Sequence, residues 1–424
     1  MIEYTQDVSL PAQRLMADTN AEPQDRLRMQ ADQLLTTAGS STKAAGAELS
    51  SIQESIIAKT EAPGQAETAR RLAEAWREQI ENRIASGELS RQEVADTMKH
   101  AQRLISNDSK FLTRDQRGNV AAGILYHMGH GRIDQGMHAT CNVTVLQNIA
   151  FMDKPSIAAE MITSAALEGK WTAPDGKVIT IPEDSMTPGM EESVFPPVDG
   201  LRTHASQIFQ VVALNDVGQR EKEPKEFVQK PAGPASMFHT LASHLLPASE
   251  YWMPNGYEVW RDSSAKETAF MGLTGKQIQE ESQRLFGDKY ETISYRSPWE
   301  SWKYPFSSKA EDYKLTKMVE SEDGLRTTIS DLDKSGKLPV VVAVDGDNVL
   351  LSSTGVIDNI IYGLRSSFRP LRTASEFIDS QLGIANHVVT VTKYDAASDR
   401  VFIENSWGKD QDGWMSVRDL WKAV

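Results

Sequence analysis

The sequence predicts an α+β protein, with amphipathic helices in its first part and β-strands near its end. Between residues 65 and 108, apolar residues recur every three to four positions, which is the period of a helix with one buried face. The continuous apolar run 338–344 is typical of a buried strand. The alternating run 388–392 and the run 401–405 behind it indicate two strands joined by a turn. These patterns together predict the fold class.

The N-terminal part divides into two predicted regions. Residues 1–64 are polar and rich in Ala, Ser, Thr and Gln, so we expect a partly disordered segment there. Residues 65–115 are expected to contain a helical hairpin, because the first apolar stripe stops at Gly87 and a capping box from Ser90 to Glu93 opens a second helix. An intramolecular propeptide, a targeting or chaperone-binding segment and a partner-binding module are all open roles for this part.

Further helices and strands are predicted after the hairpin. The range 141–152 is expected as a helix with apolar residues on one side, although its Val and Thr residues favour strands. Another helix is predicted over 156–169, with Ser156 as its cap. A β-hairpin whose second arm is 178–181 follows it. Charged residues and prolines between 221 and 234 suggest an excursion at the surface.

Length, charge and hydropathy exclude several classes of protein. A chain of 424 residues favours two or three domains, and 40% hydrophobic residues suffice for a core. The formal net charge of −14 makes nucleic acids and anionic membranes poor partners, because both carry negative phosphates. No run of 18 apolar residues is present, so no membrane span is expected. Since the first residues lack the pattern of a secretory signal, we expect a cytoplasmic protein, or one exported without a classical signal peptide, for example by injection into another cell.

The chain contains a single cysteine, Cys141, which excludes an internal disulfide. A lone cysteine is most often a small buried hydrophobe. It is also a candidate nucleophile when His and Asn residues stand elsewhere in the chain. At the start of a helix the thiol would face the partial positive charge of unpaired N–H groups, and a nearby imidazole would lower its pKa by forming a thiolate–imidazolium pair.

Three further residues complete a candidate catalytic group. His387 begins a predicted strand and is the candidate base. Asn405 ends the next strand, and its amide oxygen can accept from the second imidazole nitrogen and so orient the ring. Gln135 precedes Cys141 by six residues and is a candidate donor to the oxyanion, together with the Cys141 backbone N–H. This group predicts acyl transfer.

These residues carry a resemblance to the papain-like cysteine proteases. The segment 134–141 is similar to their Gln-Gly-then-Cys segment, and the segment 405–408 resembles their Asn-Ser-Trp-Gly motif. The resemblance implies a papain-like two-lobed fold over 116–424, with a helical lobe that carries the Cys141 helix and a β-rich lobe that carries the His and Asn. It implies a thiol protease that hydrolyses protein or peptide substrates through an acyl-enzyme thioester, without cofactor or metal.

The sequence also departs from the family pattern. Asn142 stands where the family usually has Trp, and His138 stands where it has a disulfide-bonded Cys. The distance from Cys141 to His387 is longer than usual, which implies a large insertion at about 182–335. Two alternatives therefore stay open: another thiol acyl transferase, similar to a transglutaminase or deamidase, and a papain-like binding protein that has lost catalysis.

A metal site is a rival interpretation of the same region. His127, His130, His138 and Cys141 are ligand types with short spacings. The glycines between them would break a helix that aligned them, which disfavours this interpretation. The aromatic cluster from Trp299 to Tyr304 is expected in the core of the insertion rather than at a substrate site.

Overall fold

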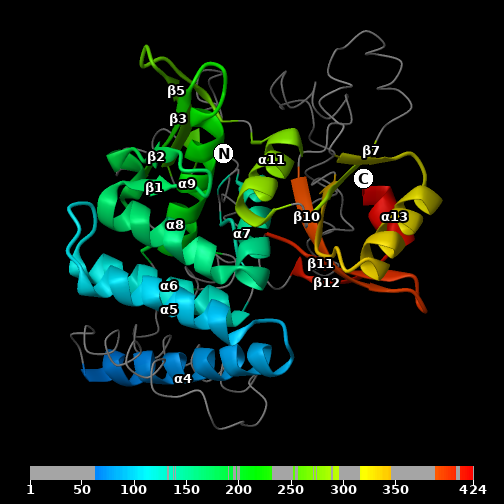
Figure 1. The fold of residues 1–424 in the computed structure, drawn as a ribbon, viewed down its shortest axis with the longest axis horizontal. Helices are drawn as coiled ribbons and strands as arrows, with labels where there is room; N and C mark the ends of the chain where they lie inside the picture. Colours follow the sequence, from blue (N-terminus) through cyan, green and yellow to red (C-terminus); the bar gives the residue numbers. More distant parts are fainter. Residues whose placement is uncertain are drawn as a thin grey trace, which may run out of the picture.

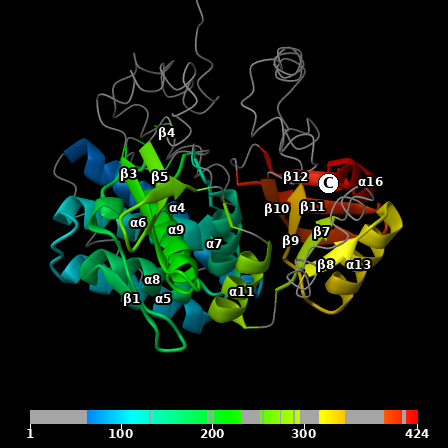
Figure 2. The same cartoon turned by 90° about the horizontal axis from the view of Figure 1, so that it is seen from above.

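The computed structural model contains a group of helices and a six-stranded sheet that lie side by side (Figure 1 and Figure 2). The structure describes residues 63–130, 133–136, 138, 140–189, 191–193, 197, 201–231, 252–253, 256–270, 272–273, 275–287, 290–295, 316–344, 387–406 and 411–423. The predictions for 1–62 and for the cluster from Trp299 to Tyr304 lie outside these residues, and so do 407 and 408 of the segment 405–408. None of the helices in these ranges combines the length and hydropathy that crossing a bilayer requires.

Two helices occupy the range of the predicted hairpin. Helix α4 (Pro63–Ala85) ends before Gly87, whose φ of +80° suits a residue without a Cβ atom. The Ser90 hydroxyl accepts a hydrogen bond of 3.1 Å from the Glu93 backbone N–H, and so caps helix α5 (Arg91–Ser106). Both helices share one apolar core with the helices that follow, which are α6 (Arg114–His130), α7 (Cys141–Asp153), α8 (Pro155–Glu168) and α9 (His204–Gln219).

Helix α8 begins slightly earlier than the sequence predicts. Its cap is Lys154 and not Ser156, which lies in the first turn. The Ser156 backbone N–H and hydroxyl both donate to Glu93 of α5, because the two helices pack together. The helix ends at Gly169, whose φ is +66°. The predicted hairpin follows as strands β1 (Lys170–Thr172) and β2 (Val178–Thr180), and then a 3₁₀ helix, η2 (Glu183–Met186).

Helix α9 is the centre of the helical core. Its residues from His204 to Gly218 are buried, and it contacts α6, α7, α8 and strand β3 (Lys225–Pro231). The predicted surface excursion is confirmed at 222–224, which are exposed. It is wrong from Phe227 onward in β3, because Phe227 and Val228 are fully buried. The range 182–335 therefore contributes to the core. In a small sheet, strand β3 pairs with β5 (Gly256–Asp262), which also pairs with β4 (Trp252–Met253) and β6 (Glu267–Ala269).

The larger sheet has the strand order β12-β11-β10-β9-β7-β8. Strand β7 runs parallel to β8 and β9, and the other neighbours are antiparallel. Its strands are β7 (Thr292–Tyr295), β8 (Thr316–Val319), β9 (Val340–Val344), β10 (His387–Asp395), β11 (Arg400–Glu404) and β12 (Gly413–Ser416). A second apolar core lies between this sheet and two helices, α13 (Glu322–Lys334) and α16 (Val417–Ala423).

A small apolar cluster joins the helical group to the larger sheet. Val145 and Ile149 of α7 pack against Tyr290 and against Val341 of β9. The Tyr290 hydroxyl donates a hydrogen bond of 2.7 Å to Asp153 at the end of α7. In both views α7 lies at this boundary with α11 (Gly275–Phe286) beside it (Figure 1 and Figure 2). Helix α7 also contacts β10, the strand that begins at His387.

Candidate active site

Cys141 is the first residue of α7 and is partly exposed. The first N–H groups of a helix have no partner within the helix, and they are available to a nearby acceptor. The backbone N–H groups of Val388, Asn142 and Cys141 itself lie near enough to the thiol to favour its thiolate form. Val388 is the second residue of β10 and directly follows His387. The sulfur therefore lies beside the beginning of the strand that carries the candidate base.

His387 and Asn405 are hydrogen-bonded to each other. The Nε2 atom of His387 lies 2.9 Å from Oδ1 of Asn405, and the two residues are only 3% and 4% exposed. They meet because β10 and β11 are antiparallel, so the start of one strand lies beside the end of the other. An amide oxygen accepts and cannot donate, so the hydrogen of the neutral ring is on Nε2 and the lone pair is on Nδ1. This is the tautomer in which Nδ1 can take a proton.

Gln135 connects the loop before α7 with the residue after Asn405. Its backbone N–H donates to the Ser406 carbonyl at 2.8 Å, and its side-chain oxygen accepts from the Ser406 hydroxyl at 2.5 Å. Its Nε2 donates to the His138 carbonyl at 2.8 Å, which leaves the second hydrogen of that amide for another acceptor. The structure thus brings Gln135 to the same region as Cys141 and Asn405. The Ser406 contact was missed by the sequence reasoning, although Ser406 belongs to the motif that carried the resemblance.

Burial moves the pKa values of the thiol and the imidazole in opposite directions. Burial raises the pKa of Cys141 to about 11, although the Val388 and Asn142 N–H groups act in the other direction. Burial lowers the pKa of His387 to about 4, and the hydrogen bond to Asn405 offsets only part of that effect. The predicted lowering of the thiol pKa is therefore wrong for this structure. The neutral thiol and neutral imidazole are the favoured forms around pH 7.

Alkylation of the single cysteine reports this protonation state directly. We expect iodoacetamide to react with native Cys141 about two orders of magnitude more slowly at pH 7 than with the urea-unfolded chain, because a thiol pKa near 11 instead of 8.5 leaves far less thiolate. The native rate should rise steadily between pH 6 and 10, as followed by intact mass. A fast, pH-independent rate at pH 5–6 would show an ion pair and contradict this expectation.

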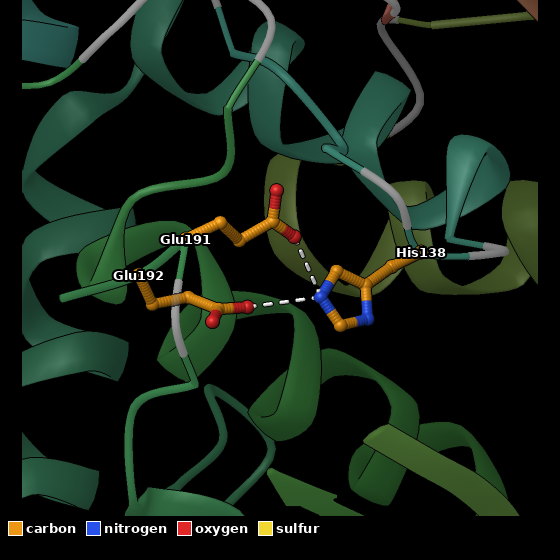
Figure 3. A group of neighbouring side chains, drawn as sticks. All are labelled: His138, Glu191 and Glu192. Atoms are coloured by element: carbon orange, nitrogen blue, oxygen red, sulfur yellow. Dashed lines mark ion pairs between the residues drawn. The ribbon is translucent and has the colours of Figure 1, made fainter. Parts of the chain in front are cut away.

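A second group of charged side chains is buried next to this site, and we call it the His138 cluster. The His138 ring lies between carboxylates. Its Nε2 is 2.7 Å from Glu191 and 2.9 Å from Glu192 (Figure 3). Its Nδ1 is 2.6 Å from Glu258. Arg202 donates to Glu192 through Nε at 2.9 Å and also through Nη2. Burial and Arg202 lower the pKa of His138, but the three carboxylates outweigh them and raise it to about 10.

His138 was a candidate ligand in the sequence, but its partners could not be identified there. The carboxylates come from two segments far from His138 in the chain, Glu191 with Glu192 and Glu258, and no spacing in the sequence links them to the ring. The rival metal group of His127, His130, His138 and Cys141 is not the one found among the described residues, where His138 groups with Glu191 and Glu192. His127 lies against the Thr203 hydroxyl at 2.8 Å, and Nδ1 of His130 lies 2.9 Å from the Tyr126 carbonyl.

Gly136 packs directly against this cluster. Its φ is +62°, and a Cβ atom there would collide with the carboxylate of Glu191. We expect Gly136→Ala to lower the free energy of unfolding by about 2–3 kcal/mol, from backbone strain and this collision together. Gly87→Ala is the matched control, because Gly87 also has positive φ but no atom within 4 Å of the new Cβ. Urea unfolding should show the larger loss for Gly136→Ala, and equal losses would contradict the contact with Glu191.

Compared with family models, curated proteins and solved structures, the chain matches none of them.

Proposed function

We propose that the chain is a cysteine peptidase that hydrolyses peptide bonds in protein or peptide substrates, with a two-lobed fold similar to that of papain. The observation that carries the proposal is the hydrogen bond between His387 and Asn405 at the start of β10. The residue after His387 is Val388, whose backbone N–H lies near the Cys141 thiol. The division into a helical core and a sheet core, with α7 at their boundary, supports the two-lobed fold. The Gln135 contact to Ser406 supports a shared site.

In the proposed reaction His387 acts as a general base from its neutral form. Nδ1 takes the proton of Cys141 as the sulfur attacks the carbonyl carbon, and the carbonyl π electrons move to oxygen. When the tetrahedral intermediate collapses, the C–N bond breaks, the imidazolium returns its proton to the leaving amine, and a thioester remains. A water molecule then gives a proton to His387 as its oxygen attacks the thioester carbon. When this second tetrahedral intermediate collapses, the C–S bond breaks, the carboxylic acid product leaves, and the imidazolium returns its proton to the sulfur.

The other residues position these groups. Asn405 keeps the proton of the ring on Nε2, so that Nδ1 retains its lone pair. The Cys141 backbone N–H and the second amide hydrogen of Gln135 are the donors proposed for the negative oxygen of the intermediate. Because Gln135 is held by Ser406 on one side and by the His138 carbonyl on the other, its amide needs little reorganisation during attack.

A peptide library with an added amine tests the proposal. The purified chain is incubated with a mixed peptide library and a primary alkylamine, and the products are identified by mass spectrometry. New N- and C-termini support hydrolysis of peptide bonds. Chain alkylated by iodoacetamide is the control, since Cys141 is the single cysteine and alkylation blocks only that thiol. It should yield no products.

Two results would contradict the proposed peptidase. Amine attached to glutamine side chains, or glutamine converted to glutamate, would show a transglutaminase or deamidase. Intact peptides at high enzyme concentration, together with peptides bound to the chain, would show a binding protein. We favour the peptidase because the residue that orients the ring is the neutral amide of Asn405. A carboxylate in that place would hold the imidazolium more strongly and would favour the transglutaminase or deamidase.

A further inference from the structure

We propose that His138, Glu191 and Glu192 form a binding site for a divalent transition-metal ion. Among the described residues, these three side chains form a group whose ligand atoms all lie within 4.8 Å of one another. One imidazole nitrogen with carboxylate oxygens is a donor set that suits Mn²⁺, Fe²⁺ and Zn²⁺. A metal site here would contradict the expectation, from the sequence, that the protein contains no metal. The proposal does not depend on whether the chain is a peptidase.

The Nε2 atom of His138 provides the main argument. The residue is 2% exposed, and Nε2 lies at ion-pair distance from one oxygen of Glu191 and one of Glu192. Nevertheless Nε2 makes no hydrogen bond, so neither oxygen is aligned with the direction in which the ring would donate. Figure 3 shows this nitrogen turned toward both carboxylates. An ion on the Nε2 lone pair would contact the nitrogen and both oxygens.

The spacing of the ligand atoms indicates the coordination geometry. Two ligands at 90° to each other, each about 2.1 Å from an ion, are about 3.0 Å apart, whereas a tetrahedral pair is about 3.4 Å apart. The distances from Nε2 of His138 to the two oxygens, 2.7 and 2.9 Å, are closer to the first value. Oε2 of Glu192 is buried without a hydrogen-bond partner and is available as a further ligand. A five- or six-coordinate ion such as Mn²⁺ or Zn²⁺ fits this arrangement best.

Glu258 prepares the ring for this role. Its Oε1 lies 2.6 Å from Nδ1 of His138, and Nε2 of Gln229 lies 2.9 Å from the same nitrogen. When the ring donates from Nδ1 to Glu258, it presents the lone pair of Nε2 to the ion. Ligating histidines in metal sites commonly have such a carboxylate on the other nitrogen. Gln229 donates to the same Glu258 oxygen at 3.1 Å and so helps to fix it.

The charges of the cluster also favour a divalent cation. Three carboxylates outnumber the guanidinium of Arg202, so the described cluster has a sum of −1 with the ring of His138 protonated and −2 with the ring neutral. A net charge in a buried place is costly unless it is compensated. One divalent ion in place of the ring proton would bring the sum to zero. Because His138 precedes Cys141 by three residues, the ion would also fasten the loop before α7 to the segment of Glu191.

Elemental analysis and metal titration of the full chain test the site. The chain is purified without chelator and analysed by inductively coupled plasma mass spectrometry, where about one Mn or Zn per chain is expected. The chelator-treated chain is then titrated with MnCl₂ or ZnCl₂ alone, and Tm should rise and saturate at one ion per chain. Glu191→Gln keeps the side-chain size and removes a charged ligand, so the rise should be lost. His130→Asn, a half-buried histidine outside the cluster, should bind as the wild type does.

The outcomes separate a metal site from a plain ion-pair cluster. No change in Tm with either ion in the wild type, or unchanged binding by Glu191→Gln, would overturn the proposal. If Glu191→Gln does not fold, X-ray absorption of the metal-loaded wild type decides. One imidazole among oxygen ligands supports the site, and a sulfur ligand or the absence of imidazole refutes it. Glu258→Gln should weaken binding about 10- to 100-fold without abolishing it.

Discussion

Replacing Cys141 by alanine is expected to lower the rate of peptide hydrolysis by about a thousandfold or more, because the proposed reaction then has no nucleophile. Substrate binding should change little, since the sulfur contributes only at the step of attack. The free energy of unfolding should change by no more than about 1 kcal/mol, because a partly exposed thiol loses one atom. Hydrolysis rates and urea unfolding measured on the same preparation check both statements.

Cys141→Ser sharpens this prediction. The hydroxyl keeps nearly the size of the thiol and can accept the same N–H groups of Val388 and Asn142. A neutral His387 must then remove a proton from a much weaker acid, so activity should fall nearly as far as in Cys141→Ala. If either variant hydrolysed peptides at the wild-type rate, Cys141 would not be the nucleophile.

The largest effect on stability is expected for Arg83→Met. The buried Arg83 guanidinium donates to three backbone carbonyls, those of Met128, Phe151 and Met152, at 2.6, 3.1 and 2.8 Å. These carbonyls belong to the last turns of α6 and α7, where they lack partners within the helix. Methionine leaves them buried and unsatisfied, and we expect a loss of about 3 kcal/mol in the free energy of unfolding.

Arg103→Met is the matched control for this variant. Arg103 pairs with Glu168, but both side chains are about 40% exposed, and exposed ion pairs contribute less than about 1 kcal/mol. Guanidinium unfolding should show a clearly lower midpoint for Arg83→Met and nearly the wild-type midpoint for Arg103→Met, with the slope unchanged in both. Similar midpoints would show that Arg83 does not hold α4 against α6 and α7. A large loss in the free energy of unfolding for Arg83→Met would show that α4 is a structural part of the helical core.

The predictions from sequence were closest where a local pattern determines local structure. The Ser90 cap, the glycine stop at Gly87 and the strand that begins at His387 are all present, although the Glu93 carboxylate of the predicted capping box contacts Ser156 instead. Each depends on a few neighbouring residues, through hydrogen bonds or backbone sterics within one or two turns. The range 182–335 was poorly predicted for the opposite reason. Helix α9 is buried on all sides, so it lacks the one-sided apolar stripe that identifies an amphipathic helix.

Within the candidate site, residue types and their order were visible in the sequence: one cysteine, a histidine at a strand start and an asparagine at the end of the next strand. The direction in which the thiol pKa shifts was not visible in the sequence. It depends on how much water is removed from around Cys141 when the chain packs. The His138 cluster was hidden as well, since Glu191, Glu192 and Glu258 meet the ring only after the chain has folded. Burial and long-range charge contacts are properties of packing, and only the tertiary structure could decide them.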